Sequence, residues 1–205
     1  MSGHLSGVQK HIRDKAGSGC VYVHCYAHRL NLVVVNTASS ISKVSEFFGV
    51  MEAVYRFITA STLRHDKFID AQKDKDLKVM EIPKLSDTWW VCRCVAVRLF
   101  KERYDSLIHA LEKITEQSHD GCEKAESIGL LHQLQSFTFI LLLWIFDDVL
   151  GITKILSDTL QGKELDLARA MELVKSVQAT LTERRNQAYF DQNIWAINYR
   201  ACKLQ

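Results

Sequence analysis

Four residues near the start of the chain are of types that bind metals or act in catalysis: Cys20, His24, Cys25 and His28. Two residues separate Cys25 from His28, a spacing at which both side chains can reach one zinc ion. A structural zinc site needs four ligands, however, and the adjacent His24 and Cys25 point to opposite sides of an extended chain. We therefore expect no metal ion here, with Cys25 buried and His28 a hydrogen-bonded core residue. Zinc binding through an unusual loop stays open as the alternative.

The same pair could act as a cysteine nucleophile with a histidine base. Such catalysis requires a thiolate, a base within hydrogen-bond reach and a third group that orients the base. The spacing of Cys25 and His28 gives no independent sign of that third group. We therefore expect no covalent catalysis at this pair.

A second candidate site is formed by Trp89 and Trp90, with Arg93 following. Exposed tryptophans stack on nucleic-acid bases, and a nearby arginine can hold a phosphate. Tryptophans beside a helix start also fill protein cores. The residues alone favour a core position, and base stacking stays open.

The acidic pair Asp147–Asp148 directly follows the apolar stretch 137–146. Carboxylates in such a helix must find partners or reach solvent. A two-metal nuclease needs carboxylates that converge from different elements of the fold. Nothing in the spacing of the acidic residues indicates convergence, so the residues alone predict no metal-dependent active site.

The composition is that of a globular protein with a balanced charge. The chain has 205 residues, of which 47% are hydrophobic and 24% charged, and its net charge of +2 is too small to indicate a nucleic-acid partner. The six cysteines have no disulfide-framework spacing and no apolar leader follows Met1, which predicts reduced thiols in an intracellular protein. The longest apolar stretch is about half of a bilayer span, so we expect no membrane partner.

Hydrophobic periodicity predicts a chain that is mixed at its beginning and helical from about Val44 onward. We expect a first helix with Val8, His11 and Ile12 on its inner face, a short strand near residues 21–23, and a helix or buried strand over 30–35. The next predicted helix is capped by Ser42 or Ser45 and has seven apolar side chains on one face: Val44, Phe47, Phe48, Met51, Val54, Tyr55 and Ile58. A surface helix and loop over 64–78 follow, and then a long helix capped at 86–88 with an inner stripe from Val95 to Ile114. The last two predicted helices cover 127–160, with Gly151 at a bend or close contact, and 167–181.

Several segments resemble proteins of the hAT transposase superfamily. HCYAHRLNLVV (24–34) resembles the Cys-x-x-His-x-Leu-Asn-Leu motif of these transposases and their domesticated relatives, and MSGHLSGVQKHI (1–12) is similar to the segment after their second catalytic aspartate. LSDTWWVCRCVAVR (85–98) resembles their Thr-Arg-Trp block. Residues 151–186 resemble the helical part of the zinc-finger MYM-type and DUF4371-containing group, so that the resemblance covers nearly the whole chain.

The resemblance implies a mainly α fold class: a fragment of a ribonuclease H-like α/β core over residues 1–42, followed by an all-helical insertion domain over 43–205. Cys25, His28 and Asn31 match the family motif and are expected to be structural.

The resemblance also implies a nucleic-acid site. Trp90 matches the family tryptophan that stacks on a flipped base beside the cleaved DNA end, and Arg93 matches the arginine after it. Trp89 stands where the family has an arginine, which removes a potential phosphate contact.

Transposases of this family cleave DNA with two aspartates and a glutamate that hold Mg²⁺ or Mn²⁺. The aspartates would precede Met1 and the glutamate would follow the chain, so we expect no catalysis and no cofactor. The expected function is that of a nuclear, non-catalytic, transposase-derived fragment that retains DNA or protein binding; its oligomeric state is left open, because the dimerisation region would lie outside. The alternatives are a helical protein-interaction domain with no nucleic-acid role and a part of a longer, active transposase.

Overall fold

The computed structural model describes residues 7–16, 28–30, 32–33, 36, 40–85, 90–162, 166–189 and 191. Most of these residues are helical and none is in a strand, which confirms the prediction of a mainly α chain. The strand predicted near 21–23 lies outside the described residues, whereas residues 30, 32 and 33 of the segment 30–35 are helical. The helices are α1 (Val8–Ala16), α3 (Ser42–Thr59), α4 (Thr62–Lys73), α5 (Trp90–Glu102), α6 (Tyr104–Gln117), α7 (Gly121–Leu134), α8 (Phe137–Leu160) and α9 (Leu167–Arg184).

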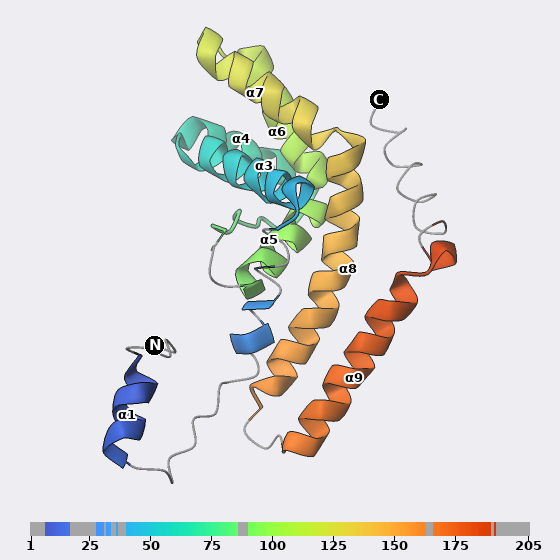
Figure 1. Ribbon diagram of the computed structural model, residues 1–205. Helices are drawn as coiled ribbons and strands as arrows, with labels where there is room; N and C mark the ends of the chain where they lie inside the picture. Colours follow the sequence, from blue (N-terminus) through green and yellow to red (C-terminus); the bar gives the residue numbers. More distant parts are fainter. Residues whose placement is uncertain are drawn as a thin grey trace.

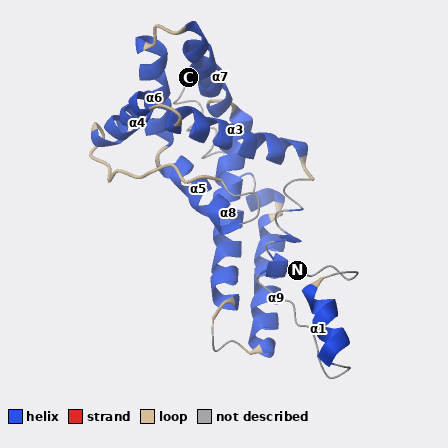
Figure 2. Ribbon diagram, turned by 90° about the vertical axis from the view of Figure 1, so that its left-hand side faces the viewer, coloured by secondary structure: helices blue, strands red, loops and turns tan. Residues whose placement is uncertain are grey.

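The helices form a bundle with one long helix running out of it. α3, α4, α6 and α7 pack together, and α8 runs from this bundle along α5 (Figure 1). α9 lies beside the second half of α8, as both views show (Figures 1 and 2). α1 stands apart from the other labelled helices in Figure 1. Val8, His11 and Ile12 are exposed there, so the prediction that they form an inner face is wrong.

α3 has the face that its sequence predicts. Six of the seven predicted apolar side chains are buried, while Tyr55 is half-buried and Phe57 is an additional buried residue. The capping prediction is wrong, because Ile41 occupies the N-cap position and no side chain caps the helix. The Ser42 hydroxyl donates to the Glu46 carboxylate at 3.0 Å instead, one turn into the helix.

The helix predicted from residues 86–88 to Ile114 is divided in two at Arg103. That residue has φ −112° and ψ 16°, outside the helical region, so α5 ends before it and α6 begins after it. The break lets α6 pack against α4 and α7 while α5 packs against α8. Val95, predicted to face inward, is 46% exposed, so that prediction is wrong; α5 buries Cys94, Val97 and Leu99 instead.

The helix predicted over 127–160 is also divided, at Gln135 and Ser136. Ser136 is the N-cap of α8, and its hydroxyl oxygen accepts a hydrogen bond from the Phe139 backbone N–H at 3.2 Å. The corner turns α8 away from α7 and down along α5 (Figure 1). α8 has 24 residues, yet no helix in the described ranges combines the length and the apolar character needed to cross a membrane.

Tyr104 gives this fold a testable pH dependence. Its hydroxyl donates to the Leu134 carbonyl oxygen at 2.9 Å, and desolvation by burial, with a further contribution from the Asp105 carboxylate, raises the pKa of Tyr104. The unfolded chain, whose tyrosine pKa is about 10, therefore loses this proton first as the pH rises. We expect the free energy of unfolding to fall with pH above about 10, and to fall less steeply in Tyr104→Phe. Urea unfolding of both proteins at about pH 8 and about pH 11 measures the difference; equal falls would contradict the assignment.

Candidate functional site

The structure describes the residues of the family motif only in part. Cys25 and Asn31 lie outside the described residues, and so does the side chain of Trp90, whose backbone begins α5. His28 lies in a short helical segment and is exposed, so the prediction that it is a core histidine is wrong. Arg93 is fully described, one turn after Trp90 on α5. The candidate site is therefore built from Arg93 and the cations that follow it on α5.

The Arg93 side chain is directed toward α3 and is half-buried. Its Cζ atom lies 4.6 Å from the centroid of the Phe48 ring, within the range of a cation–π contact. Phe48 is 7% exposed, so the guanidinium rests on a ring that belongs to the core. The contact joins α5 to α3.

Phe48 belongs to an aromatic cluster that connects α3 with α8. Its ring centroid lies 5.0 Å from that of Phe47 and 5.3 Å from that of Phe146. Phe47 in turn lies 5.0 Å from Phe139 and 5.5 Å from Phe146. Such pairs add to the stabilisation that comes from burying the rings. The surface under Arg93 is therefore well packed.

Lys101, two turns further along α5, makes two contacts with α8. Its Nζ atom lies 2.6 Å from Asp147 Oδ2 and 3.7 Å from the centroid of the Trp144 ring. Arg98 adds a weaker contact, with Nε 3.5 Å from Asp147 Oδ1. The Asp147 side chain is 16% exposed and that of Arg98 58%, so the Arg98 end of the cluster is open to solvent.

Asp148 contacts α9 rather than α5. It forms an ion pair with Arg184 of α9 and accepts a hydrogen bond from the Tyr189 hydroxyl at 3.0 Å. Of the two outcomes expected for these carboxylates, a partner or solvent, both have a partner, and the two partners lie on different helices. In the part of the chain that the structure describes, no three His, Cys, Asp or Glu side chains are grouped so that they could hold a metal ion.

Arg103, at the break between α5 and α6, is tied to the loop after α4. Its Nε atom donates to Gln72 Oε1 at 3.2 Å, and its Nη2 atom donates to the Lys78 carbonyl oxygen at 3.1 Å. Gln72 is fully buried and also exchanges hydrogen bonds with the backbone of Met80, at 3.0 Å and 3.1 Å. Arg93, Arg98, Lys101 and Arg103, the basic residues that follow Trp90, therefore each contact another element, although Arg98 stays largely exposed.

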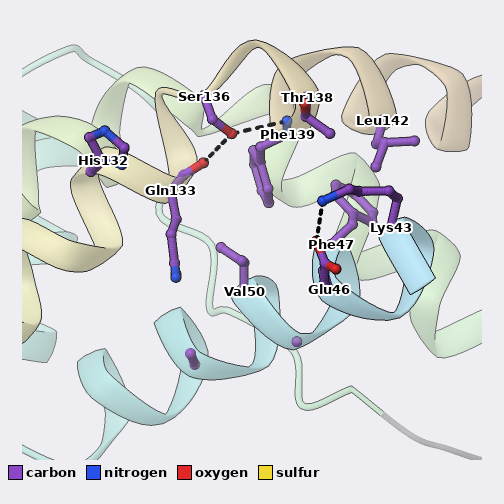
Figure 3. A pocket seen from close by; sticks show the side chains of 12 residues that line it. Lys43, Glu46, Phe47, Val50, His132, Gln133, Ser136, Thr138, Phe139 and Leu142 are labelled. Carbon is purple, nitrogen blue, oxygen red and sulfur yellow. Dashed lines mark hydrogen bonds and ion pairs between the residues drawn. The ribbon is translucent and has the colours of Figure 1, made fainter.

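A groove lies between α3 and the corner where α7 meets α8 (Figure 3). It has a volume of about 610 Å³, and its lining includes the apolar side chains of Val50, Phe139 and Leu142. The Lys43–Glu46 ion pair, at 2.8 Å, lies along its α3 side, and His132, Gln133 and Ser136 line the other (Figure 3). Sequence reasoning missed this groove, because its lining comes from segments about 90 residues apart and has no motif spacing.

No protein-family model matches the chain, and no solved structure matches the fold described above.

Proposed function

We propose that the chain is a non-catalytic helical binding module related to hAT-type transposases, and that it acts through contact with another protein rather than through DNA held by α5. The observation that supports this choice most is that two cations of α5, Arg93 and Lys101, contact other helices. Arg93 rests on Phe48, and Lys101 is bound by Asp147 and Trp144. The segment that resembles the Thr-Arg-Trp block thus has a role in holding the bundle together.

Binding a DNA phosphate with these cations would disrupt the contacts between helices. Lys101 would have to leave Asp147, a carboxylate that is 16% exposed. A partly buried charge that loses its partner is strongly unfavourable. Arg93 would give up its contact with the Phe48 ring. A phosphate would therefore have to compensate for lost packing before it contributed any net affinity.

The acidic residues support the non-catalytic part of the proposal. Hydrolysis with two metal ions requires carboxylates that meet at one place. Asp147 is directed to α5 and Asp148 to α9, and each is bound by a cation there. Neither carboxylate is available to a metal ion without breaking an ion pair. The proposed module therefore takes no cofactor, whereas the resemblance implies Mg²⁺ or Mn²⁺ for complete transposases.

The groove between α3 and the α7–α8 corner supports a protein partner. Its lining combines apolar side chains with polar and charged ones. This combination is typical of surfaces that receive a segment of another protein. Phe137, at the start of α8, is 43% exposed beside the residues that line the groove.

Fluorescence anisotropy with labelled duplex and hairpin DNA tests the choice between protein and DNA. We compare the wild type with Trp90→Ala, Arg93→Ala and the control Lys124→Ala, which removes an exposed cation from α7. Any binding should be weak, should decrease with salt, and should change by less than about threefold in each of the three variants. A loss of about tenfold or more that is confined to Trp90→Ala and Arg93→Ala would overturn the proposal. Mg²⁺- or Mn²⁺-dependent cleavage of the hairpin would overturn its non-catalytic part.

A further inference from the structure

Within the described part of the chain, α9 is attached along one side. Its one extensive contact among the described elements is with α8 (Figures 1 and 2). Of its described side chains only Ala170 is buried, while Val174, Val177 and Leu181 are half-buried. α6, by contrast, buries seven residues within the bundle. Because the burial of apolar surface is the main stabilising term, α9 is held much more weakly than the bundle helices.

The buried residues at the contact between α8 and α9 are separate from the main core. Leu156 of α8 and Ala170 of α9 are 4% and 6% exposed, yet neither belongs to the core cluster of the bundle. Along α8 that cluster ends at Leu150. Displacing α9 would therefore uncover the second half of α8 and leave the core of the bundle intact.

A polar contact holds the C-terminal end of α9. Arg184 forms an ion pair with Asp148, and its Cζ atom lies 4.9 Å from the centroid of the Tyr189 ring. The Tyr189 hydroxyl also donates to Asp148. The side chains of Arg184 and Asp148 are 31% and 34% exposed, so water and salt reach the pair. Near the N-terminal end of α9, by contrast, the contact includes the buried Ala170.

We propose that α9 is a strap that opens away from α8 as a unit, with Asp148 as its latch, while α3 to α8 stay folded. Opening uncovers the apolar side of the second half of α8. A helix with few buried contacts commonly opens at a lower free energy than the whole molecule. Salt favours the open state, because it screens the partly exposed Asp148–Arg184 pair.

Hydrogen–deuterium exchange of the full chain, resolved by peptide mass spectrometry, tests the strap. In the wild type the amides of α9 should exchange at least about tenfold faster than those of α6. Asp148→Asn should increase the exchange rate of the α9 amides by a further three- to tenfold or so and leave the exchange rate of the α6 amides unchanged. Raising the salt concentration from about 0.05 M to about 0.5 M should also accelerate α9 in the wild type.

The neighbouring residue provides a matched control. Asp147→Asn makes the same chemical change one position away, but the partners of Asp147 lie on α5, so exchange in α9 should stay at the wild-type rate. Arg184→Gln removes the other partner of the same ion pair, and it replaces Asp148→Asn in the test if that variant does not fold. The proposal is overturned if latch variants leave α9 unchanged, or if α9 and α6 exchange at one common rate in the wild type.

Discussion

Leu107→Ala is expected to lower the free energy of unfolding by about 2–5 kcal/mol, a large share of the total for a small protein. Leu107 is 0% exposed and lies in α6, the helix that packs against both α4 and α7. Truncation removes buried methyl groups and leaves a cavity that four rigid helices cannot close. Denaturant unfolding followed by circular dichroism gives the value.

Leu63→Ala is the matched control for this prediction. The same side chain is truncated on α4, but Leu63 is 74% exposed and has little packing to lose. Its effect should stay within about 0.5 kcal/mol. Similar losses in the two variants would mean that α6 does not lie at the centre of the core as described.

Gln72→Leu should destabilise the fold by about 2–4 kcal/mol, although it adds an apolar side chain of similar size. The Gln72 amide exchanges hydrogen bonds with the Met80 backbone and accepts one from Arg103. Leucine leaves these groups without partners in a place where water does not replace them. The loop 77–85 should become more mobile, because Gln72 and the His65–Glu81 contact attach it to α4 and the variant removes the first of these.

Two measurements define the outcome for Gln72→Leu. Urea unfolding gives the loss in stability, and hydrogen exchange of residues 77–85 reports the loop. Gln133→Leu, at an exposed position of α7, is the control and should be nearly neutral. A stability for Gln72→Leu equal to that of the wild type would show that the buried amide contributes nothing to the fold.

The sequence predicted helix type well and helix boundaries poorly. The face of α3 follows from residues three and four apart, and packing against the bundle retains this local pattern. The break at Arg103 has no such local signal, since hydrophobic residues continue on both sides, and Arg103 turns there toward Gln72, which is distant in the sequence. The break at Gln135–Ser136 has one that the prediction did not use, because Ser136 is a residue type that caps helices and does so for α8.

The candidate site was predictable in its residue types and not in its contacts. The cost of burying a charge required that Asp147 and Asp148 find partners or reach solvent. Asp147 binds a cation of α5 and Asp148 one of α9 because of how these helices pack against α8. The spacing of residues in the sequence does not predict this packing. The contact between Arg93 and Phe48 joins residues 45 positions apart in the sequence, so no sequence motif could predict it.

A double-mutant cycle between Arg93 and Phe48 tests most directly whether the α5 cations belong to the fold. Arg93→Ala, Phe48→Leu and the double variant are unfolded with denaturant; leucine keeps an apolar side chain at position 48 and removes the aromatic face. A guanidinium that rests on the ring should give a coupling free energy of about 0.5–2 kcal/mol. A coupling free energy indistinguishable from zero would leave the Arg93 side chain available to a phosphate and contradict the role assigned to α5.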